Sequence, residues 1–276
     1  MFPISDDSPR RHGLPYVNIG LIAISAIVFL YELTLTNLDQ TVFFYKFGLI
    51  PKELTEGISF ECLATTRDLL GRVATGPHAG AICDVALARG ARDISSPIGS
   101  WGTVFSSMFI HGGVLHFLGN MVFLWVFGDN VEDRLGHLRY LAFYVAMGVV
   151  AAWTQIGINM GSEIPTIGAS GAIAGVLGAY LLLYPYNQVR TLVVFFFITF
   201  IRIPAVYLLG FWIVLQFFNG IGSLDSSIRS GGVAYWAHIG GFAAGVIAIA
   251  LLKLLVWRER LIPRRPRSIE YWDFDR

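Results

Sequence analysis

Long stretches without a charged side chain limit what this chain can fold into. Crossing the hydrocarbon core of a bilayer takes about 20 apolar residues in an α-helix, and a helix satisfies its own backbone hydrogen bonds in lipid. Most of these stretches are close to or above that length. They are residues 13–31, 94–128, 140–162, 164–189, 203–224 and 230–252.

The composition supports a membrane location. Of the 276 residues, 55% are hydrophobic and only 14% are charged, whereas soluble domains carry about 25% charged residues. So few charges cannot cover the surface of a soluble enzyme. The net charge of +1 also provides no basic face for nucleic acid. We therefore expect an integral membrane protein surrounded by the lipid bilayer, with no nucleic-acid partner.

The same stretches predict an all-α, polytopic fold of six transmembrane helices. The second helix follows the Gly112–Gly113 pair, and the fifth begins near Pro204, because proline suits the first turn of a helix. The apolar, β-branched segment 191–203 is then an extended loop at the membrane interface. The predicted helices are roughly 15–36, 112–129, 139–159, 166–185, 204–220 and 234–256.

Basic residues predict the orientation, because lysine and arginine favour the cytoplasmic side. With six crossings, the arginines of both tails and of two short loops fall on one side, and the opposite short loops hold only Arg229. We expect a tail at 1–14, a six-helix domain at 15–257 and a tail at 258–276, with both tails cytoplasmic. The lack of an Arg-rich presequence favours a bacterial inner membrane.

A long first outer loop, about 37–110, separates the first two helices. Its most polar part, roughly 53–97, contains Cys62 and Cys83, the only two cysteines of the chain. On the outer side of a membrane they can form a disulfide. In a reducing compartment they stay as thiols, and the sequence leaves both readings open.

The few polar residues within the predicted helices lie at one depth. Ionisable residues inside a membrane are costly and mark functional sites. His116 and Asn120 lie on the 112–129 helix, with His111 just before it, Ser170 on the 166–185 helix and His238 on the 234–256 helix. All three helices begin on the outer side. At 1.5 Å per residue, their polar groups lie very roughly 10 Å below the outer surface.

Small residues predict that the 166–185 and 234–256 helices pack closely, because small-xxx-small patterns let membrane helices approach. His238 shares the face of its own helix's glycines, so packing brings its imidazole to the Ser170 hydroxyl. A serine beside an imidazole is the minimal activated nucleophile for acyl transfer. The two patterns are Gly171-xxx-Gly175 and Gly241-xxx-Gly245.

The same chemistry needs donors for an oxyanion. His116 and Asn120 are four residues apart and share one face of their helix. The backbone N–H of Ser170, at a helix N-terminus, is a third donor. One such donor is worth roughly 3 kcal/mol in the transition state. No metal or organic cofactor is called for by this chemistry.

Each residue also has a simpler explanation. A serine between glycines is usually a packing residue, and Asn120 fits an interhelical hydrogen bond. A metal site at His111 and His116 is poorly supported, since neither an HExxH pattern nor an inward carboxylate accompanies them. A proton-coupled transporter using these two and His238 is an alternative, and it predicts function that survives Ser170→Ala. The joint pattern favours the serine–histidine pair.

In their order and spacing, these residues resemble the motifs of the rhomboid intramembrane serine proteases. The resemblance covers about 100–255, and the 15–36 helix fits the family's basic six-helix form. The matching segments are HGGVLHFLGNM at 111–121, VEDRLG at 131–136, GASGA at 168–172 and AHIGGFAAG at 237–245.

The resemblance implies a serine endopeptidase that cuts single-pass transmembrane proteins in or near the membrane. Ser170 would be the nucleophile and His238 the general base, without a third acid. His116 and Asn120 would be the oxyanion donors, and His111 a residue of the outer cavity. It also implies a mobile gate formed by the fifth helix and the loop before the sixth. Glu132 and Arg134 match a structural motif on the cytoplasmic side.

This chain departs from the family at two places. Ala174 stands four residues after Ser170, where some rhomboids have a tyrosine that stacks on the catalytic histidine. Trp236 or Tyr235 is then a candidate for orienting His238. The family's Trp-Arg pair in the first outer loop is not evident, since Trp101 is followed by glycine. A non-catalytic member that binds membrane helices is a further alternative, against which the presence of both dyad residues argues. No oligomeric state is predicted.

Overall fold

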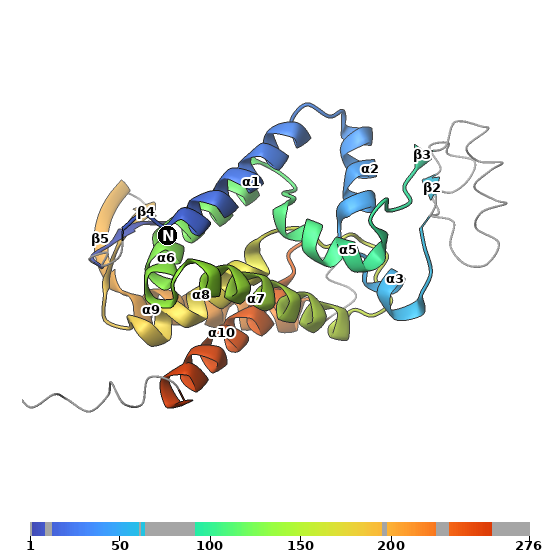
Figure 1. Cartoon of the computed structure of the whole chain (residues 1–276). Helices are drawn as coiled ribbons and strands as arrows, with labels where there is room; N and C mark the ends of the chain where they lie inside the picture. The colour runs from blue at the N-terminus through green and yellow to red at the C-terminus, as the bar shows by residue number, and fades with distance from the viewer. Residues whose placement is uncertain are drawn as a thin grey trace, which may run out of the picture.

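The computed structural model describes residues 2–8, 13–60, 62–63, 92–194, 198–224 and 232–255, and its body is a bundle of long helices (Figure 1). Helices occupy all six ranges predicted from the charge-free stretches, with ends that differ by a few residues. They are α1 (Tyr16–Glu32), α6 (Val114–Leu135), α7 (His137–Ile158), α8 (Ser170–Leu183), α9 (Ala205–Gly222) and α10 (Tyr235–Leu255).

The chain is an integral, multi-pass membrane protein. Within the described ranges, α6, α7, α9 and α10 are long and apolar enough to cross a membrane, while α1 and α8 are shorter apolar helices. With 14 residues, α8 is about 21 Å long, less than the hydrocarbon core of roughly 30 Å. Ten consecutive residues of α8, from Gly171 to Tyr180, are buried, so protein rather than lipid surrounds it.

Helices α8 and α10 touch backbone to backbone. A Cβ added at Gly241 would collide with the carbonyl oxygen of Gly171, and one at Gly245 with the carbonyl oxygen of Gly175. A Cβ at Gly178 would collide with the Phe242 backbone. Only glycine leaves room for this approach, and the two helices therefore meet along the faces that carry the Gly-xxx-Gly patterns.

A buried carboxylate of α6 holds the start of α1. The Glu132 side chain accepts hydrogen bonds from the backbone N–H groups of Val17 (3.0 Å) and Asn18 (2.7 Å). The side-chain amide of Asn18 donates a hydrogen bond to the Leu124 carbonyl (3.0 Å) and accepts one from the Tyr140 hydroxyl (2.8 Å). Since α1 has no side-chain cap of its own, Glu132 satisfies N–H groups that a helix leaves open at its N-terminus.

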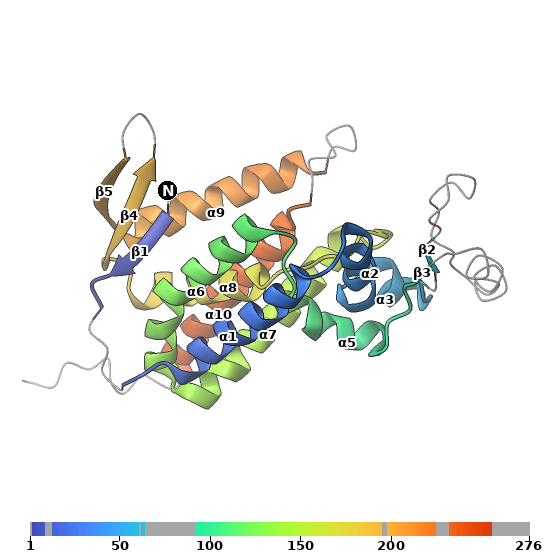
Figure 2. The same ribbon diagram turned by 90° about the horizontal axis from the view of Figure 1, so that it is seen from above.

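The sequence did not predict β-structure, but the described residues contain a three-stranded sheet and a separate two-stranded pair. Strands β4 (Gln188–Val194) and β5 (Ile198–Pro204) form an antiparallel hairpin between α8 and α9, and β1 (Phe2–Asp6) pairs with β4 (Figure 2). The segment 191–203 is extended as expected, but it is paired with other strands rather than being a loop. The prediction of an all-α fold is therefore corrected to a mostly helical fold with a small sheet.

The long connection between α1 and α6, predicted to be the first outer loop, contains helices and strands of its own. It contains α2 (Asn37–Phe47), α3 (Pro51–Glu56) and α5 (Gly99–Ser106), the last followed by a 3₁₀ turn, and the short pair β2 (Cys62–Leu63) and β3 (Arg92–Asp93). The predicted choice between a disulfide and free thiols involves Cys83, which lies outside the described residues. Much of the 53–97 insertion and the tail at 258–276 also lie outside them.

Candidate active site

Ser170 is the first residue of α8. Gly168, two residues earlier, leaves room for the His116 ring. Gly168 has a φ of +126°, in the region that favours glycine, and donates its backbone N–H to the Ser107 carbonyl (2.8 Å). A Cβ added there would lie 2.8 Å from the His116 ring and 3.6 Å from the Ser170 hydroxyl oxygen. The absence of that Cβ lets the His116 imidazole and the Ser170 hydroxyl face the same point.

Helix α10 supplies a histidine that contacts Ser170. The Nε2 atom of His238 lies 2.7 Å from the Oγ of Ser170, which is a hydrogen-bond distance. The His238 side chain is 9% exposed, and it lies in the first turn of α10. Nε2 can accept the serine proton only when the neutral ring carries its own proton on Nδ1. The pair has the geometry of a nucleophile and its general base.

The His238 ring has two further contacts, and both come from α9. The Nδ1 atom lies 2.8 Å from the side-chain oxygen of Gln216. The Trp212 ring packs against the imidazole, with 5.8 Å between ring centroids and 36° between planes. Neither residue was predicted to orient His238. The two predicted candidates, Trp236 and Tyr235, both lie beside Gly220.

A cavity of about 670 Å³ brings the polar groups of α6, α8 and α10 together. Ser170, His238, His116 and Asn120 all line it. Apolar side chains of these helices and Trp212 of α9 complete much of the wall. A cavity that is mostly apolar, with a few convergent polar groups, is the usual form of a small binding or catalytic site.

Two donors on α6 face this cavity. His116 is exposed within it, whereas Asn120 is only 8% exposed. Among the described residues, the side-chain nitrogen of Asn120 is buried without a hydrogen-bond partner. Buried polar atoms are nearly always bonded, so this nitrogen is available to donate to a group that enters the cavity beside Ser170.

His111 lies behind the cavity rather than in its wall. Its side chain is fully buried, and its ring is 5.3 Å from the His116 ring, centroid to centroid. Its backbone N–H donates to the Glu32 carboxylate of α1 (3.1 Å), and its Nδ1 lies 3.2 Å from the Phe109 carbonyl. His111 thus contacts the His116 ring from behind and is not among the described residues that line the cavity.

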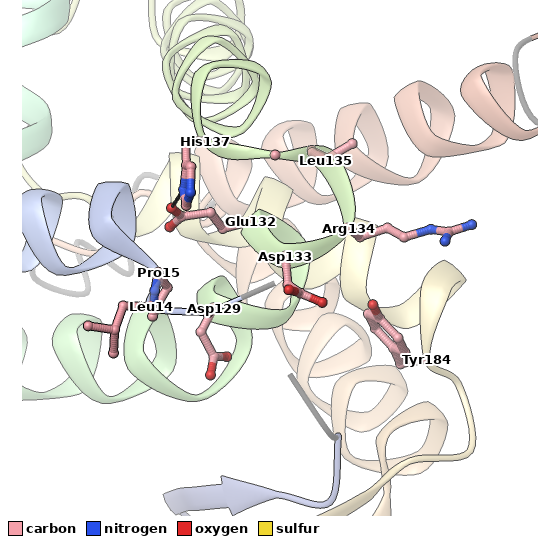
Figure 3. Close-up of a pocket in the computed structure, with 11 residues that line it drawn as sticks. Leu14, Pro15, Asp129, Glu132, Asp133, Arg134, Leu135, His137 and Tyr184 are labelled. Atoms are coloured by element: carbon pink, nitrogen blue, oxygen red, sulfur yellow. Dashed lines mark hydrogen bonds and ion pairs between the residues drawn. The ribbon is translucent and has the colours of Figure 1, made fainter. Parts of the chain in front are cut away.

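A second hollow, of about 390 Å³, lies at the other end of α6, and Figure 3 shows its polar side chains. Glu132 and Arg134, the residues of the predicted structural motif, both line it. The Glu132 carboxylate contacts the His137 ring as well as the start of α1. Sixteen positions along α6 from His116, or roughly 24 Å, this hollow is remote from the serine–histidine pair.

The similarity of this chain to known proteins extends over all the residues that line the cavity. A family model described as the Rhomboid domain matches residues 99–254, which include every residue of the cavity. "Rhomboid protein 1, mitochondrial" of Saccharomyces cerevisiae is 28% identical over 174 residues, which are 62% of this chain and 46% of that protein. "Rhomboid protease GluP" of Bacillus subtilis is 32% identical over 157 residues, 56% of this chain and 27% of that protein.

A human relative matches in the same way. "Presenilin-associated rhomboid-like protein, mitochondrial" is 26% identical over 162 residues, which are 56% of this chain and 38% of that protein. This chain thus spans less than half the length of the relatives that it matches.

Proposed function

The chain belongs to the rhomboid family, and on that basis we propose that it is an intramembrane serine endopeptidase. It hydrolyses a peptide bond in or near the transmembrane segment of a single-pass membrane protein. The observation that carries the proposal is the 2.7 Å contact between Ser170 Oγ and His238 Nε2, made by two helices inside a shared cavity.

In this proposal the reaction follows from the positions of the two side chains. His238 Nε2 takes the proton as Ser170 Oγ attacks the carbonyl carbon, and the imidazolium then gives that proton to the leaving amine. Water, activated by the same imidazole, hydrolyses the acyl-enzyme and frees the serine. The Ser170 backbone N–H, His116 and Asn120 donate hydrogen bonds to the oxyanion, where preorganised donors have their largest effect.

The proposed substrate has a segment that can leave the helical state. A peptide carbonyl within a helix is already bonded to an N–H four residues on, so the scissile bond must unwind before Ser170 reaches it. A cavity of about 670 Å³ is suited to a short extended stretch. We therefore expect small or helix-destabilising residues near the cleaved bond.

The sheet supports the proposed six-crossing topology. Strand β1 from the N-terminal region pairs with β4 from the connection between α8 and α9, so both segments lie on one side of the membrane. Arg190 and Arg202 lie in this hairpin, and arginine-rich loops favour the cytoplasm. Both tails are accordingly proposed to be cytoplasmic. A bacterial inner membrane is the proposed location.

Substitution of the dyad tests the proposal. Ser170→Ala and His238→Ala should each abolish cleavage of a single-pass substrate in liposomes while leaving the unfolding temperature unchanged. Ser162→Ala is the matched control, because Ser162 lies between α7 and α8 and does not line the cavity. A fluorophosphonate should label Ser170 in the wild type. Cleavage by Ser170→Ala at the wild-type rate would mean that another group is the nucleophile.

A further inference from the structure

Helix α9 contacts the His238 ring on both its edge and its face. The Gln216 oxygen lies 2.8 Å from Nδ1, and the Trp212 ring, one turn earlier, packs against the same imidazole. Trp212 also packs against Phe242 of α10, with 6.1 Å between centroids. The residues at positions 212 and 216 share one face of a helix, so a single face of α9 holds the ring.

The contact from Gln216 decides which nitrogen carries the proton. A side-chain amide oxygen only accepts hydrogen bonds, so Nδ1 must be the donor. The lone pair of Nε2 is then free to take the Ser170 proton. With the proton on Nε2 instead, the ring could not act as the base. In serine–histidine–aspartate sites the carboxylate on the histidine holds this tautomer, and its loss is severe.

We propose that Gln216 is a positioning residue that holds His238 in the tautomer able to deprotonate Ser170, and that this makes the dyad depend on where α9 stands. The inference rests on the proposed protease function. It adds a third group, a neutral amide, to the pair, and it places that group on a different helix from both members.

The packing of α9 makes this dependence strong. Only four of its 18 residues are buried, namely Ala205, Leu208, Leu209 and Gly220, and the helix lies at the edge of the bundle (Figure 2). Trp212 and Gln216 are themselves half-buried. A helix with so few buried contacts can tilt at little cost. A tilt that opens the cavity would draw the amide away from Nδ1 and leave the tautomer unfixed.

The test separates positioning from substrate access. Gln216→Leu removes the acceptor, and we expect kcat to fall about tenfold, the effect of one lost hydrogen bond, with KM within twofold of the wild type. Labelling of Ser170 by a small fluorophosphonate should slow to the same extent. Gln216→Glu keeps an acceptor oxygen whether or not it is ionised, so kcat should stay within about threefold.

Asn219→Leu is the matched control. It makes the same kind of change three residues further along α9, on an exposed side chain, and should leave kcat and labelling unchanged. If Gln216→Leu lowers the unfolding temperature, Gln216→Met, which keeps the unbranched shape, replaces it. A wild-type kcat in the folded variant, a change in KM alone, or a Gln216→Glu enzyme no faster than Gln216→Leu would overturn the inference.

A double-mutant cycle tests the dependence on α9. Trp212→Ala loosens the same face, so its loss of kcat should be smaller in the Gln216→Leu background than in the wild type, because both act on one ring. Independent, multiplicative losses would overturn the dependence. If the wild type cleaves no substrate and Ser170 is not labelled, the protease proposal itself fails, a result distinct from all of these.

Discussion

Removing the Glu132 carboxylate should destabilise the fold without altering the chemistry. Its side chain is 1% exposed and accepts hydrogen bonds from the first backbone N–H groups of α1, at Val17 and Asn18. It also contacts the His137 ring, as Figure 3 shows. Glu132→Ala removes every one of these bonds at once and leaves the start of α1 without a cap.

The magnitude follows from the groups left without partners. Each buried N–H that loses its partner costs about 1–3 kcal/mol, and the lost negative charge at a helix N-terminus costs about 0.3–1 kcal/mol more. Partial hydration of α1 favours the low end, so we expect a loss of about 3 kcal/mol in the free energy of unfolding. For a chain of this size that is roughly 6–12 °C in unfolding temperature. Glu132→Gln keeps one acceptor oxygen and should lose about half as much.

The assay compares two glutamates. Glu163→Ala is the control, because the Glu163 carboxylate pairs with Lys52 at 2.6 Å on the surface and its side chain is 48% exposed. Such surface pairs contribute about 0–1 kcal/mol. Unfolding is followed in detergent, and Ser170 labelling is measured well below both transitions. Equal unfolding temperatures for the two variants, or slower labelling of folded Glu132→Ala, would refute the reasoning.

Two further perturbations test the packing and the outer loop. Gly241→Leu should lower both folding yield and cleavage, because a side chain at this position meets the Gly171 carbonyl. Gly157→Ala is the control and should be neutral, because the space around Gly157 is open. Equal effects of the two substitutions would mean that α8 and α10 do not touch. Burial raises the pKa of Glu53 above its ordinary 4.5, and the Phe60 N–H offsets this only in part. The folded loop therefore binds that proton more tightly, and its stability falls as pH rises above 4.5. As the pH is raised above 4.5, proteolysis of the loop should become faster in the wild type, whereas its rate in Glu53→Gln should stay constant.

The six helices were predictable because the absence of charge is a local signal. The largest extension beyond a predicted end occurs in α6, where two of the charged residues that the helix includes are buried. The prediction ended the second helix at 129, but α6 runs on to Leu135 through Asp129 and Glu132. Both carboxylates are buried. Glu132 is satisfied by the start of α1, more than 100 residues away in sequence. Sequence patterns within one helix do not contain that information.

The sheet was missed for a related reason. The extended character of 191–203 was visible in its β-branched and aromatic residues, but a strand forms only with a partner. One partner, β1, begins at Phe2, and it pairs with β4 almost 190 residues later. The Asp6 carboxylate also accepts a hydrogen bond from the Tyr180 hydroxyl of α8. Without knowledge of this long-range pairing, the sequence predicts only a tail for the β1 segment and a loop for 191–203.

Gln216 was not predicted as a site residue, because it lies near the C-terminus of its helix rather than near the N-terminus. The predicted site residues lie near the N-termini of helices that are expected to begin on the outer side. In the proposed topology α9 ends there, and Gln216 lies six residues before its last residue, Gly222, or roughly 9 Å along the helix. That is the depth expected for the other polar groups.

The same count from the C-terminus finds a second glutamine on α7. Gln155 lies three residues before the end of that helix, and its side-chain oxygen accepts the backbone N–H of Ala237 (3.3 Å), the neighbour of His238. Gln155 thus holds the backbone at the start of α10, and Gln216 holds the ring that this backbone carries. In the proposed topology, both amides lie on helices whose C-termini are at the outer surface. His238 is therefore held from two sides by neutral acceptors, which membrane helices can carry at less cost than charges.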